Sequence, residues 1–326
     1  MTEAPDLPPS LRYYPDSRPG IRRRRCGRGF SYLNDDGTRI DAAQERSRIQ
    51  ALAVPPAWED VWISPLQSGH LVATGQDARA RKQYRYHPEW TALQAAQKFS
   101  ALPDFAEALP AIRRRIRRDL AEEPGEEAFA IAAAAAMIDR LSLRVGNPEY
   151  TRENGSYGAL TLKGRHVRLR DGRLNISYTG KGGKRVRRQL ADSRLMKALE
   201  RIRDLPGAEL LTWLDDEGRT RRVTSAGLND YLADAGGIET LTAKTFRTWA
   251  GTVAAFEVAL QDERPTIKAM AEAAAERLHN TPAIARNSYI HPDVLDLAKT
   301  ARDMPPRSGT RELTVTEQRL QAFLTS

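Results

Sequence analysis

Hydrophobic positions follow two different periodicities along the chain. Up to about Tyr86 the apolar residues occur in short runs with polar neighbours, separated by turn signals such as Asp36-Gly37, and this pattern is typical of β-strands. After Pro88 the apolar residues recur at helical spacing. The first stretch predicts strands at 30–33, 61–63, 70–74 and around 84–86, one helix at 42–52, and a loose arm rich in Pro, Asp and Ser at 1–20.

The second stretch is predicted to be mostly helical. Its strongest segment contains the eleven apolar residues from Ala128 to Ile138, with acidic residues just before them. Five consecutive alanines in it indicate close packing against a neighbour. Pro110 suits the first turn of one helix, and Ser225 is a candidate N-cap of another. The spacing predicts helices at 90–99, 109–120, 126–143, 226–235, 243–261, 265–278, 282–290, 292–302 and 315–324.

Residues 158–190 interrupt the helical pattern with an antiparallel meander. Asp171-Gly172 is a good hairpin turn within it. The alternation predicts strands at 159–162, 166–170 and 174–178, with 186–190 as a candidate further strand.

These patterns together predict an α+β protein of two domains. The first is small and β-rich, 1–90, and the second is larger and mostly helical, 91–326, with an embedded three-stranded antiparallel sheet. The single cysteine, Cys26, excludes an intramolecular disulfide. The longest apolar run is too short to span a bilayer, and the N-terminus lacks a secretory signal. We therefore expect a cytoplasmic protein.

Charge points to the class of partner. The formal net charge is +9, and the 51 basic residues comprise only nine lysines, which leaves 42 arginines. A net-basic, arginine-rich globular chain favours a polyanion partner, most often nucleic acid. Genomic base composition can also replace lysine by arginine, so the sign of the charge is the stronger argument.

Motifs for nucleotide or metal chemistry are missing from the sequence. The glycine-rich segment 180–184 lacks P-loop spacing, and the five histidines form no metal motif, so we expect neither nucleotide nor metal cofactor. A metal-free attack on a phosphodiester needs a nucleophile, cations and a general acid. Arginine cannot serve as the acid because its pKa is too high. Lys181 is the most suggestive of the few lysines, because it lies between glycines in a tight turn.

Five segments between about residues 70 and 292 carry motifs whose order is informative. They are 75–86 (GQDARARKQYRY), 143–150 with 154–162 (LRVGNPEY and NGSYGALTL), 178–182 (YTGKG), 244–249 (KTFRTW) and 280–289 (NTPAIARNSY). In this order and spacing they resemble the type IB DNA topoisomerases, in particular the poxvirus-like branch found in bacteria. The resemblance implies the catalytic core shared by tyrosine recombinases and topoisomerases IB.

The resemblance also implies catalytic roles. Tyr289 would attack the scissile phosphorus and form a 3′-phosphotyrosyl intermediate. Arg144 and Arg247 would hold the non-bridging oxygens, and Lys181 would protonate the leaving 5′-oxygen. Asn280 stands where poxvirus relatives carry histidine, so it would supply a hydrogen bond rather than acid–base chemistry. The neighbouring His279 is not expected to replace it, because successive residues of a helix point about 100° apart.

Contacts to DNA are implied for five further residues. They are Gln83, Tyr84 and Tyr86 in the N-terminal domain, which would be the DNA-binding domain, and Tyr150 and Lys244 in the catalytic domain. The expected enzyme is a monomer that closes around duplex DNA and relaxes supercoils without ATP. The arginine-rich segment from Arg113 to Arg118 is either a phosphate-tracking surface or a solvated helix face.

Two other functions remain open from the sequence. A tyrosine recombinase shares the Arg, Lys, Arg and Tyr set, although it normally carries His-x-x-Arg where this chain has Lys244-Thr245-Phe246-Arg247. A DNA-binding protein without catalysis would explain the basic charge equally well. These catalytic assignments also have ordinary structural alternatives. They are a helix C-terminal cation at Arg144, a solvated turn lysine at Lys181, an ion-paired helix arginine at Arg247, and a packing tyrosine at Tyr289.

Overall fold

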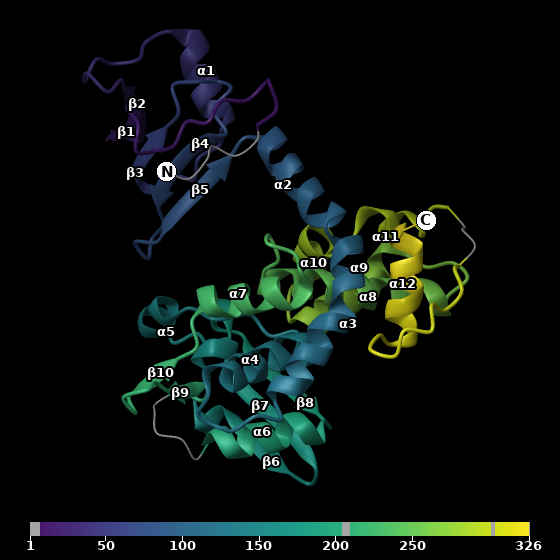
Figure 1. Cartoon of the computed structure of the whole chain (residues 1–326). Coiled ribbons are helices and arrows are strands. Elements are labelled where there is room, and N and C mark those ends of the chain that lie inside the picture. Colours follow the sequence, from purple (N-terminus) through teal and green to yellow (C-terminus); the bar gives the residue numbers. More distant parts are fainter. Residues whose placement is uncertain (1–6, 204–208, 301–303, 326) are drawn as a thin grey trace. The chain divides into compact units, whose positions relative to one another are not determined.

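The computed structural model is mixed α+β, which confirms the predicted fold class (Figure 1). It describes residues 7–203, 209–300 and 304–325. No helix within these ranges is long and apolar enough to cross a membrane.

The chain divides into two compact units, Met1–Gln97 and Lys98–Ser326. The division falls inside helix α2, Pro88–Ser100, whereas the sequence placed the domain boundary between residues 90 and 91. Because one uninterrupted helix links the units, no turn or loop marks a break at that point of the chain.

The first unit is built on a five-stranded antiparallel sheet in the order β2-β1-β3-β4-β5. Its core contains Ile21, Ile63 and Ala73 from the strands and Ile49 from helix α1. The elements are β1 Ile21–Cys26, β2 Gly29–Leu33, α1 Ala43–Ala51, β3 Glu59–Ile63, β4 Leu71–Gln76 and β5 Lys82–Tyr86.

The prediction of a loose arm at 1–20 is wrong for residues 7–20, the part of it that the structure describes. Leu11 is only 5% exposed, and the Arg12 amide donates to the Ser68 carbonyl at 2.8 Å. The Trp62 indole donates to the Arg18 carbonyl at 3.0 Å. Contacts with residues some fifty positions away order this Pro-rich segment, and they are not visible in local composition. The remainder of the expected arm, 1–6, lies outside the described residues.

The second unit is organised around α4, Glu127–Leu141, which is buried along most of its length. Its alanine run leaves room for α3, α6, α7 and α8 to pack against it, as the sequence predicted, because an alanine methyl allows close approach of neighbouring helices. The other helices are α3 Leu102–Asp119, α5 Pro148–Asn154, α6 Ser193–Arg203, α7 Ser225–Gly236, α8 Ala243–Gln261, α9 Ile267–Leu278, α10 Pro282–Tyr289, α11 Pro292–Asp296 and α12 Val315–Thr325.

Three predicted helix ends are corrected. Helix α3 begins seven residues before the expected start, with Pro103 in its first turn and Pro110 in its interior. A proline inside a helix costs about 3 kcal/mol, but the buried Phe105, Leu109 and Ile112 offset that cost. Helix α11 ends at Asp296 rather than at 302, and residues 301–302 lie outside the described part of the chain. The N-cap of α7 is Thr224 rather than Ser225, because its side chain accepts from the Gly227 amide.

The embedded three-stranded antiparallel sheet is confirmed, in the order β6-β7-β8. Its strands are β6 Val167–Arg170, β7 Arg173–Thr179 and β8 Arg185–Leu190. The Asp171-Gly172 turn has positive φ at both residues, 53° and 68°, as a type I′ hairpin requires. A separate hairpin, β9 Thr212–Leu214 with β10 Thr220–Arg222, was not predicted.

The strand expected at 159–162 is wrong, because Ala159–Thr161 forms a 3₁₀ turn, η1. The Ala159 amide donates to the Arg144 carbonyl and the Leu160 amide to the Val145 carbonyl, both at 2.8 Å. These backbone groups therefore pair with the segment that follows α4 rather than with a strand. Only glycine fits at Gly158, where a Cβ would lie 2.6 Å from the Arg144 carbonyl oxygen.

Neither expectation for the arginine-rich helix face holds for Arg113, which is buried and ion-paired inside the unit. Its guanidinium contacts Asp139 and Glu317, each at 2.8 Å. The Trp249 indole also donates to Glu317, at 3.1 Å. Burial alone would raise the pKa of Glu317, but the bonds from Arg113 outweigh burial and hold that pKa below its ordinary value. This network anchors α12 to α3, α4 and α8.

Neutralising Glu317 should therefore destabilise the second unit. We expect Glu317→Gln to lower the free energy of unfolding by about 2–3 kcal/mol, because it leaves the buried Arg113 with one carboxylate instead of two. The matched control is Glu217→Gln, which removes an exposed ion pair with Arg219 and should change stability by less than about 0.5 kcal/mol. Urea unfolding followed by tryptophan fluorescence measures both, and equal effects would contradict the assignment.

Candidate active site

Arg247 lies near the start of α8 and is 5% exposed. Its guanidinium donates to the backbone carbonyl of Ser142 and, at 3.0 Å, to that of Leu278. Ser142 is the C-cap of α4, and Leu278 is the last residue of α9. Carbonyl oxygens at helix C-termini lack intrahelical donors and carry partial negative charge. Two helix ends therefore stabilise this cation without neutralising it.

A second arginine lies close to the first. Arg144 donates to Oδ1 of Asn280. Burial, and after it the charge of Arg144, lowers the pKa of Arg247 to about 10. Among the described residues, neither arginine forms an ion pair with a carboxylate. The site thus holds two opposing positive charges that an anion would relieve.

Two buried donors in this site have no hydrogen-bond partner: Nε of Arg247 and Nδ2 of Asn280. Leaving a buried donor unpaired costs about 1–3 kcal/mol. An oxyanion bound between the arginines could accept from both donors, so the arrangement fits a phosphate better than a neutral ligand.

Left-handed backbone conformations bring these side chains together. Ser142 and His279, which end α4 and α9, have φ of 52° and 49°, and such values are uncommon for residues other than glycine. Each turn redirects the chain so that Arg144 and Asn280 follow close behind it. Nε2 of His279 instead lies 3.2 Å from the Arg187 carbonyl oxygen, whereas Asn280 contacts Arg144.

Tyr289 is the last residue of α10, and its ring centroid lies 5.4 Å from Cζ of Arg247. The Thr252 hydroxyl of α8 lies 3.2 Å from its carbonyl oxygen. A Cβ added to Gly251 would lie 2.6 Å from that same oxygen and 3.0 Å from Cβ of Tyr289. The absence of a side chain at Gly251 therefore allows α10 to approach α8 and places Tyr289 beside Arg247.

Lys181 lies in the exposed turn between β7 and β8. No hydrogen bond or ion pair is recorded for it within the described ranges, so the structure does not show it in contact with the other four predicted catalytic residues. The strand that leads into this turn lies near two of them, Arg144 and Arg247. Burial raises the pKa of Tyr178, three residues earlier, and the charges of Arg144 and Arg247 oppose that effect.

The predicted DNA contacts are surface residues in both units. In the first unit Tyr84 and Tyr86 are 50% and 43% exposed, with stacked rings 6.1 Å apart. The Gln83 amide donates to Asp77 at 3.1 Å. In the second unit Tyr150 is 55% exposed, and Lys244 is exposed in the first turn of α8.

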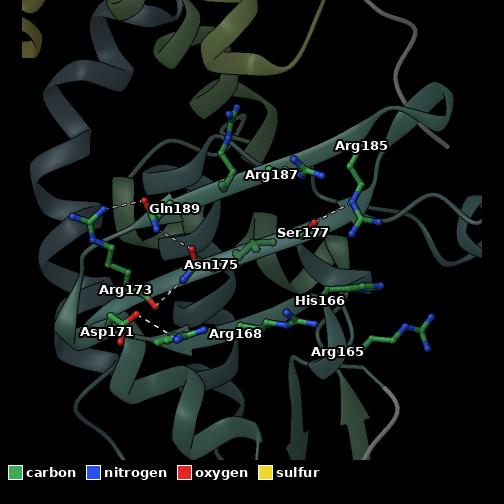
Figure 2. Close-up of a pocket in the computed structure, with 13 residues that line it drawn as sticks. Arg165, His166, Arg168, Asp171, Arg173, Asn175, Ser177, Arg185, Arg187 and Gln189 are labelled. Atoms are coloured by element: carbon green, nitrogen blue, oxygen red, sulfur yellow. Dashed lines mark hydrogen bonds and ion pairs between the residues drawn. The ribbon is translucent and has the colours of Figure 1, made fainter.

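The embedded sheet also carries a basic surface that was not predicted from the sequence (Figure 2). Polar and apolar residues alternate along its strands, so Leu174, Tyr178 and Val186 are buried on one face. The opposite face, which we call the arginine face, carries Arg168, Arg170, Arg173, Arg185 and Arg187. The alternation of polar and apolar residues along these strands was visible in the sequence and had predicted the strands themselves. The pairing that collects the arginines on one face required the observed register.

Two family models match the chain. The model described as "Eukaryotic DNA topoisomerase I, catalytic core" matches residues 87–287, which include Arg144, Lys181, Arg247 and Asn280. The chain belongs to this family. The model described as "Bacterial DNA topoisomerase IB, N-terminal domain" matches residues 29–77. The chain is therefore a type IB DNA topoisomerase with a bacterial-type N-terminal domain, and the resemblance inferred from its motifs is confirmed.

Two viral relatives agree with this assignment. The DNA topoisomerase 1B of Acanthamoeba polyphaga mimivirus is 28% identical over 293 residues, which cover 85% of this chain and 87% of that protein. The DNA topoisomerase 1B of vaccinia virus (strain Copenhagen) is 21% identical over 272 residues, 82% of this chain and 84% of that protein. A solved structure of the XerH site-specific recombinase in a post-cleavage complex has a TM-score of 0.40 and 16% identity, and the match spans 60% of this chain and 51% of that chain.

The close approach at Gly251 predicts a strong effect of a single methyl group. Alanine normally stabilises a helix relative to glycine by about 1 kcal/mol, but in Gly251→Ala the added Cβ must displace Tyr289. We expect topoisomerase activity to fall by about 10- to 100-fold, because small displacements of reacting groups cost that much. Gly227→Ala, in a helix where the nearest atom to an added Cβ is 3.3 Å away, should retain activity. Normal relaxation rates for Gly251→Ala would argue against the proposed packing.

Proposed function

We propose that this chain is an ATP-independent enzyme that relaxes supercoiled duplex DNA by transient cleavage of one strand. The observation that carries the proposal is the pair Arg144 and Arg247, which lie near one another and form no ion pair with a carboxylate of the described residues. Arg247 also lies beside Tyr289. A phosphodiester placed there would relieve their repulsion and accept from the unpaired donors of Arg247 and Asn280. Family membership supports the same activity.

In the proposed reaction the Tyr289 hydroxyl attacks the scissile phosphorus and loses its proton to solvent. A bond forms between Tyr289 Oη and phosphorus, and the bond to the 5′-oxygen breaks. Lys181 gives a proton to that oxygen, which leaves as a free 5′-hydroxyl. The product is a 3′-phosphotyrosyl enzyme, and the 5′-hydroxyl later reverses the reaction. One phosphodiester replaces another, so the bond energy is kept and no ATP is required.

Arg144 and Arg247 would stabilise the extra negative charge that develops on the non-bridging oxygens. Guanidinium groups suit this role because they donate two parallel hydrogen bonds and stay charged even with a lowered pKa near 10. Asn280 would donate its amide to a phosphate oxygen. Donors already in place at the transition state are worth about 3–4 kcal/mol each.

Both domains would contact the DNA. Gln83, Tyr84 and Tyr86 would contact DNA from the N-terminal domain, and Tyr150 and Lys244 from the catalytic domain. We propose that a monomer encloses the duplex while the free end rotates, and that the enzyme acts on the nucleoid in the cytoplasm. The arginine face continues from the turn that carries Lys181, and we assign it to contacts with the DNA backbone, which dominates affinity in such complexes.

The catalytic assignment is tested by relaxation of a supercoiled plasmid in EDTA without ATP. The wild type should relax it and form a covalent complex with DNA, whereas Tyr289→Phe should form no complex because the attacking oxygen is gone. Tyr32→Phe, a conservative change in the first unit, is the control. An adduct formed by Tyr289→Phe would refute the nucleophile. Joined recombinant products would indicate a recombinase, and tight binding without any adduct would indicate a DNA-binding protein.

The arginine face is tested by the salt dependence of binding. For Arg168→Ala with Arg170→Ala, the slope of log affinity against log salt should become shallower by about 0.9 for each phosphate that the variant no longer neutralises. The cleavage rate at saturating DNA should stay unchanged. The control removes Arg221 and Arg222, which pair with Asp215 and Glu209 on an exposed hairpin. Fluorescence anisotropy of a labelled duplex measures both slopes, and an unchanged slope in the Arg168 and Arg170 variant would exclude this face from the interface.

A further inference from the structure

Lys98 forms a direct contact with the segment that carries the nucleophile, although it belongs to none of the family-like motifs. It lies in the last turn of α2 and is half-buried. Its Nζ donates to the backbone carbonyl of Ser288 at 2.7 Å. Ser288 immediately precedes Tyr289 at the end of α10. Carbonyls in the last turn of a helix lack intrahelical donors, so Lys98 supplies the partner that this carbonyl would otherwise miss.

The surroundings of Lys98 are unfavourable for its positive charge, so a hydrogen-bond acceptor such as the Ser288 carbonyl stabilises it. Burial, and then the charge of Lys244, lowers the pKa of Lys98 to about 8. No ion pair is recorded for Lys98 in the described part of the chain. An amine held in a half-buried position without a carboxylate is costly, and the Ser288 carbonyl is the acceptor that compensates for it.

The residue after Lys98 contacts the segment that follows the proposed nucleophile. Phe99 is 7% exposed, and its ring meets that of His291 edge to face, with centroids 5.5 Å apart. Two successive residues of α2 therefore contact Ser288 and His291, which flank Tyr289. On the α8 side the Thr252 hydroxyl lies against the Tyr289 carbonyl. The backbone around Tyr289 is thus fixed by two separate helices.

We propose that Lys98 is a positioning residue of the cleavage reaction. By binding the Ser288 carbonyl it holds the last turn of α10 and so keeps Tyr289 aligned for attack on the phosphorus. Lys98 itself neither transfers a proton nor contacts the leaving oxygen. The inference rests on the proposed role of Tyr289 as the nucleophile.

The test measures single-turnover formation of the covalent adduct on two DNA substrates. One has the normal 5′-oxygen at the scissile phosphate, and the other has sulfur in its place, which leaves without needing a proton from a general acid. Lys98→Met keeps the length of the side chain but cannot donate, and Lys98→Arg can donate. Lys98→Gln, which is polar but too short to reach the carbonyl, replaces the methionine variant if that variant fails to fold. Lys197→Met, at an exposed position of α6, is the matched control.

We expect Lys98→Met to slow adduct formation by about 10- to 100-fold on both substrates, with DNA affinity changed less than about threefold, and Lys98→Arg to recover most of the rate. A wild-type rate in Lys98→Met would overturn the inference. Rescue by the sulfur substrate would instead assign Lys98 to proton transfer, and a defect confined to affinity would make it a DNA contact; either result contradicts positioning. If the wild type itself forms no adduct, the proposed function fails rather than the role of Lys98.

Discussion

The buried guanidinium of Arg247 is the constraint on which the rest of the site depends. A positive charge in the interior is normally paired with a carboxylate, but here the recorded partners are carbonyls at the ends of α4 and α9. A carboxylate would neutralise the charge and compete with a phosphate for it. Carbonyl dipoles lower the cost of burial and leave the full charge available. Both helices must therefore end at this point, which explains the left-handed residues Ser142 and His279.

The two arginines of the candidate site lie close together at a cost in stability. Arg144 lowers the pKa of Arg247 because two like charges oppose each other in a poorly solvated site. Contacts elsewhere in the unit must therefore offset the free energy that burial and charge repulsion cost at this site. The network of Arg113, Asp139, Glu317 and Trp249 does so on another side of α8. There the buried Arg113 meets two carboxylates and stabilises the packing of α12, whereas the buried Arg247 meets only backbone carbonyls among its hydrogen-bond partners in the described ranges.

Sequence patterns predicted elements whose stabilising contacts are local. The α8 range 243–261 was predicted to the residue, and the β6–β7 turn followed from Asp171-Gly172. Patterns failed where the backbone pairs with distant residues, as at η1, which bonds to residues after α4. Four consecutive arginines at 22–25 are visible in the sequence as a cluster of positive charge. In the structure, however, Arg23 lies over the Phe30 ring and donates to the Val54 carbonyl at 3.2 Å. The identities of the candidate catalytic residues came from family-like motifs, whereas the carbonyl partners of Arg247 and the contact of Lys98 with Ser288, 190 positions away, required the fold.

One stripe of α8 joins the separate parts of the site. Lys244, Arg247, Thr248, Gly251 and Thr252 follow one another at intervals of three, one, three and one residues, so they share a single helix face. Along this face Lys244, the proposed DNA contact, comes first, and Arg247, the proposed phosphate-binding arginine, comes next. Gly251 and Thr252, which contact the backbone of Tyr289, come last. A rigid helix fixes the distances between these groups without any loop. If Lys244 binds DNA and Tyr289 is the nucleophile, as we propose, their geometry would be coupled, because one helix carries Lys244, Arg247 and the residues that contact Tyr289.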